Sequence, residues 1–144
     1  MEFDDGGEVL CVMLKDKWCL IDFEAVVEIC GGVRISKLPG LSTRFCGVCD
    51  YKGTILPVFD GRQSQNSDVE KELLVVVAEP NGKFGILAQG DAHIMSLQGT
   101  EQVIRPERDG GDEDVPYRIL QKDGRLFYRI DIAKMLESLS LRPI

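Results

Sequence analysis

The side chains that could carry out catalysis are few, and their spacing assembles no familiar catalytic group. The only histidine, His93, lies in the alternating segment Asp91-Ala92-His93-Ile94-Met95, which is typical of a β-strand. A nucleophilic side chain needs a base beside it, and no carboxylate pair is set apart by its spacing. No glycine-rich loop follows a strand and opens a helix, so the pattern of a phosphate-binding loop is missing. The sequence therefore predicts a binding protein with no catalytic residues and no cofactor, rather than an enzyme.

The chain has five cysteines, and Cys46 and Cys49 form the one spacing that could support thiol or metal chemistry. A structural zinc site takes four ligands, but the chain offers no second closely spaced cysteine pair and a single histidine. A thioredoxin-type pair opens a helix, whose N-terminus lowers the thiol pKa, whereas the residues after Cys49 are typical of a turn. We expect Cys46 and Cys49 to be structural thiols in a reducing compartment, with no bound metal. A thiol redox or metal protein that uses these two residues is the first alternative.

Length and charge narrow the class of protein further. The 144 residues suit one domain, and the formal net charge is −7. Residues 1–8 and 109–114 each carry four acidic and no basic residues, which leaves 16 acidic and 17 basic residues elsewhere. We expect an acidic N-terminal tail over residues 1–7 and no nucleic-acid partner, because nucleic-acid-binding domains carry basic patches. No apolar run approaches the roughly 20 residues that span a bilayer, and the acidic start does not resemble a secretion signal. We therefore expect a cytoplasmic protein with no direct membrane insertion.

Short apolar runs separated by turn residues predict strands along nearly the whole chain. Two pairs of runs flank the strong hairpin signals Asn81-Gly82 and Asp123-Gly124, and a third pair flanks Tyr51-Lys52-Gly53. Separate strands are predicted over Lys83–Ala88 and Ala92–Leu97, and residues 98–116 are predicted to be a long polar loop. One helix is predicted from about Asp131 to Ser138, with Asp131 as its N-cap. Roughly ten short strands at regular spacing predict an all-β fold with a C-terminal helix, in which closed antiparallel barrels remove exposed edges.

Several motifs occur along the chain in a fixed order: Val26-Val27-Glu28-Ile29, Leu38-Pro39-Gly40, Gly47-Val48-Cys49-Asp50-Tyr51-Lys52-Gly53-Thr54-Ile55-Leu56-Pro57-Val58-Phe59-Asp60, Phe84-Gly85-Ile86-Leu87, Glu101-Gln102-Val103-Ile104-Arg105-Pro106 and Ile130-Asp131-Ile132-Ala133-Lys134-Met135-Leu136. This series resembles the CheW family of chemotaxis coupling proteins, which reads V-x-E-I, a proline-containing loop and then G-V-x-N-L-R-G-x-I-x-P-V-x-D-L. The resemblance extends from about residue 8 to residue 138 and therefore covers nearly the whole chain.

The resemblance implies two small five-stranded β-barrel subdomains that pack together, with the chain crossing from one to the other and returning. It implies a non-enzymatic adaptor that binds the regulatory domain of a CheA-type histidine kinase and the cytoplasmic tip of a chemoreceptor. At this length we expect residues 1–144 to be a single CheW-like domain, the free adaptor type. The matching motif residues place the expected partner-binding surface near Val26, Glu28, Lys52, Gly53 and Gly85.

Some residues depart from the family pattern. Lys52 stands where an arginine is usual, and it keeps the charge but lacks the planar guanidinium. Asp50 replaces an asparagine and Gly61 a leucine, while Arg118 and Arg129 stand at sites that are usually glycine and apolar. These changes predict an altered surface, as in a divergent relative that serves a separate signalling array. A barrel protein that binds a small ligand between its two halves is the second alternative.

Overall fold

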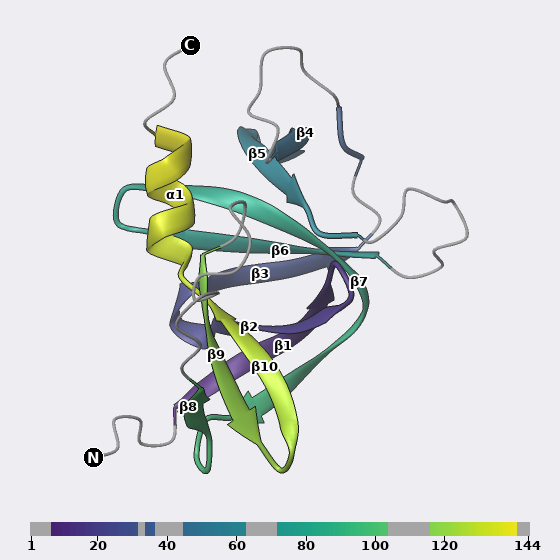
Figure 1. Cartoon of the computed structure of the whole chain (residues 1–144). Coiled ribbons are helices and arrows are strands. Elements are labelled where there is room, and N and C mark those ends of the chain that lie inside the picture. Colours follow the sequence, from purple (N-terminus) through teal and green to yellow (C-terminus); the bar gives the residue numbers. More distant parts are fainter. Residues whose placement is uncertain (1–6, 32–33, 37–44, 63–71, 104–115, 141–144) are drawn as a thin grey trace.

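The computed structural model describes residues 7–31, 34–36, 45–62, 72–103 and 116–140, and the side chains of these except 45, 46 and 138–140 (Figure 1). Strands make up most of this part of the chain, and one helix follows the last strand. The elements in chain order are β1 (Glu8–Leu14), β2 (Lys17–Asp22), the 3-10 turn η1 (Phe23–Ala25), β3 (Val26–Gly31), β4 (Phe45–Tyr51), β5 (Thr54–Asp60), β6 (Glu72–Glu79), β7 (Gly82–Ser96), β8 (Glu101–Val103), β9 (Tyr117–Lys122), β10 (Arg125–Ile130) and α1 (Ile132–Ser140). The predicted all-β class with a C-terminal helix is confirmed.

The tight turns follow from local sequence. At Lys15-Asp16, Lys52-Gly53 and Asp123-Gly124 both central residues have positive φ, the geometry whose twist matches the strands of a hairpin. The β6–β7 turn differs from the expected Asn81-Gly82 pair, because Glu79 pairs with Gly82 and the turn is centred on Pro80-Asn81. Proline presets the φ angle that the first central position of a common β-turn requires.

The first barrel consists of β1, β2, β10, β9 and β8 together with the second half of β7. Its strands follow the order β7-β1-β2-β10-β9-β8, with β2 and β10 parallel and the other neighbours antiparallel. A short turn joins the end of β7 to β8, and the Lys122 ammonium donates to the Ser96 carbonyl oxygen at 2.9 Å. β8 itself is a correction, because the sequence predicted only a polar loop over residues 98–116.

The second barrel consists of β3, β6, β5 and β4 together with the first half of β7. Its seam lies between β4 and the residues after β3. There the backbone N–H groups of Ser36 and Val48 each donate to the other residue's carbonyl oxygen at 2.8 Å. This exchange closes the ring of strands.

β7 runs through both barrels as one strand of 15 residues. The sequence predicted two strands here, over Lys83–Ala88 and Ala92–Leu97. They are joined by a bulge at Gly90, whose φ is +86°, where the register with β1 shifts between Cys11 and Met13. Glycine adopts this conformation without the steric penalty that a side chain meets, so the strand can bend from one barrel into the other.

The largest apolar cluster lies between the two barrels and against α1, and it includes Leu10, Val75, Phe84, Ile86 and Met135. Two smaller apolar clusters fill the barrels, one in the first barrel and the other in the second. β6 contributes to two of them, since alternate residues of this strand face the second barrel and the shared core. Packed side chains therefore occupy the interior between the two halves, where the second alternative would have placed a small ligand.

The helix begins one residue later and ends two residues later than expected. Asp131 is its N-cap, as predicted, because its Oδ1 accepts the backbone N–H of Lys134 at 3.0 Å. No helix in the described part of the chain has the length and apolar character to cross a bilayer. The expected loop around Pro39 and the acidic tail up to residue 6 lie outside the described residues.

Candidate protein-docking surface

A bulge in β3 determines where Glu28 points. Val26 pairs with Val77 of β6, but Glu28 pairs with Val76, so β3 has one extra residue in between. Residues two apart in a regular strand share a face. The extra residue instead sends Val26 toward the core between the barrels and Glu28 toward the second barrel.

The β4–β5 turn brings a cation to the same place. Its central residues, Lys52 and Gly53, have φ angles of +52° and +86°. The Asp50 carboxylate stabilises the turn, because its Oδ1 accepts the backbone N–H of Gly53 at 3.0 Å. An asparagine could do the same through its amide oxygen, so the departure at Asp50 preserves the turn.

Glu28, Tyr51 and Lys52 form one connected group at the mouth of the second barrel. The Tyr51 hydroxyl donates to Glu28 Oε1 at 2.5 Å, and Lys52 Nζ lies 3.1 Å from the same oxygen. The ammonium also lies 5.3 Å from the centre of the Tyr51 ring, within cation–π range. The side chains of Lys52 and Glu28 are 70% and 39% exposed, so a partner could reach both.

The electrostatics of this group favour the charged forms of its acid and base. The Tyr51 hydroxyl and then the Lys52 ammonium hold the pKa of the Glu28 carboxyl below its ordinary value. In return, the hydrogen bond to Glu28 raises the pKa of Tyr51 and the pKa of Lys52. Glu28 and Lys52 therefore present a carboxylate and an ammonium that neutralise each other until something competes for them.

Three of the five predicted residues lie together in the structure, and the other two pack against the apolar cores. Glu28, Lys52 and Gly53 meet at the mouth of the second barrel. Val26 is half-buried against the core between the barrels. Gly85 is buried, and a Cβ built there would lie 2.8 Å from Leu74 Cδ1. The role that the structure gives Gly85 is packing beneath the sheet, and partner binding near these residues stays a prediction.

Three large apolar side chains close to Glu28 in the sequence are exposed, and sequence analysis did not single them out. Phe23, Val27 and Ile29 are 41%, 45% and 40% exposed although they are large and apolar. We call these three residues together with Glu28 and Lys52 the β3 surface. The apolar run of β3 looks like a buried strand in the sequence; only the bulge and the edge position of β3 show which of its side chains reach solvent.

The first alternative finds little support in the thiols that the structure describes. Cys49 is buried, and this burial raises its pKa, which disfavours the thiolate that redox chemistry requires. The side chain of Cys46 lies outside the described part of the chain. Among the side chains that are described, no three His, Cys, Asp or Glu residues are grouped to hold a metal ion. His93 packs its ring 6.0 Å from that of Trp18.

Comparison with known proteins decides the family. The model of the CheW-like domain matches residues 8–140, which include both barrels and the helix. This chain belongs to the CheW family. It is 23% identical to the chemotaxis protein CheW of Bacillus subtilis (strain 168) over 141 residues, which cover 94% of this chain and 90% of that protein. The crystal structure of the scaffolding protein TtCheW from Thermoanaerobacter tengcongensis superposes with a TM-score of 0.66 at 18% identity, covering 88% of this chain and 90% of that one. The fold that the sequence motifs implied is thereby confirmed.

Two departures from the CheW pattern have a structural reason. A Cβ at Gly61 would lie 2.4 Å from Leu14 Cδ2 and 3.0 Å from the carbonyl oxygen of Leu87, so a leucine does not fit this packing. Arg129 is held by an ion pair, with its Nε donating to Asp22 Oδ1 at 2.9 Å. Both changes lie where the barrels or their strands meet, and neither residue belongs to the β3 surface.

Proposed function

We propose that this protein is a non-enzymatic adaptor that couples chemoreceptors to a CheA-type histidine kinase in a bacterial chemosensory array. It would act in the cytoplasm as a single CheW-like domain. Its partners would be the regulatory domain of the kinase and the cytoplasmic tip of the receptor. The observation that carries this proposal is the match to the CheW-like domain over residues 8–140, in a chain whose relatives are named as a chemotaxis protein and a scaffolding protein.

The β3 surface has the composition of a protein-docking site. Large apolar side chains exposed near a few charged groups in the chain are typical of surfaces that bind proteins. β3 also pairs with β6 on one side only within the described strands, and a strand edge can accept a partner's backbone. Phe23, Val27 and Ile29 would supply the apolar contact, and Glu28 and Lys52 would form a charged rim.

Charged side chains of a partner could replace the ion pair between Glu28 and Lys52. Solvent screens a pair this exposed, so the pair contributes little to stability and a partner can open it at small cost. A partner segment that carries both an acid and a base would replace one internal pair by two pairs across the interface. Such rim charges chiefly affect the rate of association.

The test compares two charge reversals of equal size. Lys52→Glu changes the β3 surface, while Arg125→Glu changes an exposed residue at the β9–β10 turn, at the opposite end of the molecule (Figure 1). Binding of each variant and of the wild type to the kinase regulatory domain and to a receptor-tip fragment is measured by biolayer interferometry at several salt concentrations. Thermal melts accompany each measurement.

We expect Lys52→Glu to slow association with at least one partner and to change its salt dependence, with stability altered by no more than about 0.5 kcal/mol. Arg125→Glu should bind as the wild type does. Equal binding by Lys52→Glu and the wild type would remove Lys52 from the interface. Wild-type protein that binds neither partner would refute the coupling function.

A further inference from the structure

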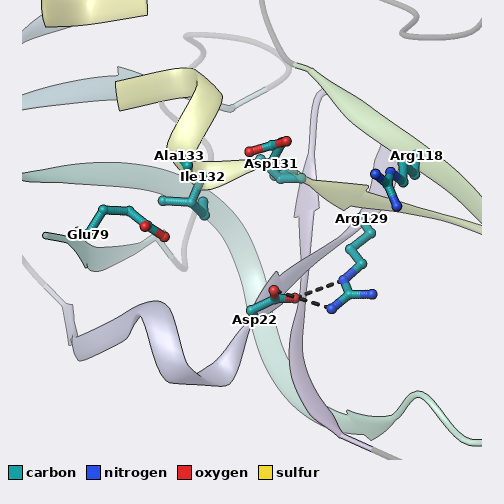
Figure 2. A pocket seen from close by; sticks show the side chains of 8 residues that line it. Asp22, Glu79, Arg118, Arg129, Asp131, Ile132 and Ala133 are labelled. Atoms are coloured by element: carbon teal, nitrogen blue, oxygen red, sulfur yellow. Dashed lines mark hydrogen bonds and ion pairs between the residues drawn. The ribbon is translucent and has the colours of Figure 1, made fainter. Parts of the chain in front are cut away.

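A second polar feature involves none of the five residues of the β3 surface. A pocket of about 330 Å³ opens where the end of β2, the β6–β7 turn, β9, β10 and the start of α1 meet (Figure 2). Five charged residues line it: Asp22, Glu79, Arg118, Arg129 and Asp131. Glu79 comes from the second barrel, whereas Asp22 and the two arginines come from the first. The pocket therefore bridges the two barrels beside the helix.

Three of the five charged residues already form hydrogen bonds within the protein. The Arg129 guanidinium donates two hydrogen bonds to the Asp22 carboxylate, from Nε to Oδ1 at 2.9 Å and from Nη2 to Oδ2 at 3.3 Å. The Asp131 carboxylate caps the helix through the backbone N–H of Lys134. Within the part of the chain that the structure describes, Arg118 and Glu79 have no ion-pair partner, and Figure 2 shows them on opposite sides of the pocket.

The position of Arg118 is unfavourable for the fold by itself. Arg118 and Arg129 are directly opposite each other in the β9–β10 pair, so their side chains lie on the same face of the sheet. Like charges at directly opposed positions destabilise a sheet. Asp22 neutralises the Arg129 guanidinium, whereas the Arg118 guanidinium has no ion-pair partner among the described residues. A residue that costs stability at an exposed site is better explained by binding than by folding.

We propose that this pocket is a second docking site, which receives an acidic and a basic side chain that lie next to each other on a protein partner. Arg118 would bind the carboxylate through its planar fork of donors, and Glu79 would bind the cation. Ile130 and Ile132, which are buried, also line the pocket and supply part of its apolar surface. The inference rests on the proposed function, because an adaptor that holds two partners at once needs docking contacts besides those of the β3 surface.

The occupant is a protein side-chain pair rather than a free small molecule. Sites for small molecules enclose most of the ligand behind largely apolar walls. This pocket is open and mostly polar, so it can hold the tips of two side chains but cannot enclose a ligand. Because its two unpaired charges come from different barrels, the bound pair would also link the barrels to each other.

The first test uses a probe that needs neither kinase nor receptor. The capped dipeptide Ac-Glu-Lys-NH2 is titrated into the 15N-labelled protein, with Ac-Gln-Gln-NH2 as the neutral probe. We expect the amide signals of Arg118, Arg129 and Ala133 to shift, with a Kd on the order of millimolar. The affinity should fall at least fivefold in Arg118→Gln and stay unchanged in Arg125→Gln, a matched change in the same hairpin. Equal shifts with both peptides, or equal affinity in Arg118→Gln, would overturn the proposal.

The second test separates the pocket from the coupling function. Arg118→Gln and Glu79→Gln are compared with the wild type for binding to the kinase regulatory domain and to the receptor-tip fragment. Weaker binding to either partner, with an unchanged melting temperature, supports the second docking site. Wild-type affinity for both partners in both variants overturns it while leaving the adaptor function intact. If the wild type binds neither partner, the adaptor function fails and the peptide titration alone decides on the pocket.

Discussion

Replacing Gly47 by alanine should open the seam of the second barrel. A Cβ at residue 47 would lie 2.2 Å from the carbonyl oxygen of Ser36 and 2.9 Å from its carbonyl carbon. These atoms belong to the backbone, so the clash is relieved only if Ser36 moves away from β4. That movement breaks the two hydrogen bonds of 2.8 Å that Ser36 exchanges with Val48.

The expected cost follows from those two bonds. Each contributes about 0.5–1.5 kcal/mol net, so Gly47→Ala should lower the free energy of unfolding by about 1–3 kcal/mol. In a chain of this size a loss of about 2 kcal/mol lowers the melting temperature by about 4–8 °C. Differential scanning calorimetry measures the melting temperature, and urea titration gives the free energy of unfolding.

Gly31→Ala provides the matched control, since it changes a glycine near the same seam without a clash. The nearest atom to a Cβ at Gly31 is the Glu72 carbonyl oxygen at 4.0 Å. Alanine at a compatible site restricts the unfolded chain, so this variant should be unchanged or up to about 1 kcal/mol more stable. If Gly47→Ala were as stable as Gly31→Ala, with unshifted amide signals of Ser36 and Val48, the closure of the second barrel as described would be wrong.

The other predictions concern packing, ionisation and thiol reactivity. Gly85→Ala should cost about 1–3 kcal/mol, measured by urea titration, because its Cβ meets the buried Leu74 side chain; a neutral effect would show that the core beneath the sheet is loosely packed. Tyr51→Phe should raise the pKa of Glu28 toward its ordinary value of about 4.3, as followed by the NMR shift of its carboxyl carbon; an unchanged titration would show that the hydroxyl does not stabilise the carboxylate. Because the folded-state pKa of Glu28 is lowered, its stabilising contribution is present above about pH 4.3 and is lost as the pH falls through the folded-state pKa. Native Cys49 should react with iodoacetamide far more slowly than in the unfolded chain, read by peptide mass spectrometry; rapid native labelling would restore the thiol alternative.

The sequence predicts best those structural features that neighbouring residues determine. The turn at Lys52-Gly53 and the helix N-cap at Asp131 are predicted correctly, because their signals lie within two or three residues of the feature itself. β8 was missed because its three residues, Glu101–Val103, become a strand through pairing with β9. β7 was predicted as two strands because only its pairing with β1 shows that the Gly90 bulge bends one strand and does not end it.

The candidate docking surface was also predicted only in part, because some of its contacts depend on pairing between distant strands. Motif order located Glu28 and Lys52, but their contact depends on the register of β3 against β6, in which one extra residue turns Glu28 to the other face. No local pattern marks that residue. Gly85 shares the motif series, yet its packing against Leu74 depends on strands that are distant in sequence. Arg118 and Arg129 were noticed as departures, and only the β9–β10 register shows that they are opposed and that Asp22 serves one of them.

The proposed coupling function requires this protein to hold a chemoreceptor and a CheA-type kinase at the same time. The most direct measurement mixes a receptor-tip fragment, the kinase regulatory domain and the full chain, and determines the mass of the resulting complex by size-exclusion chromatography with light scattering. We expect one complex that contains all three proteins and that does not form when the receptor fragment and the kinase domain are mixed alone. Competition between the two partners for this chain, or no complex with either, would contradict it.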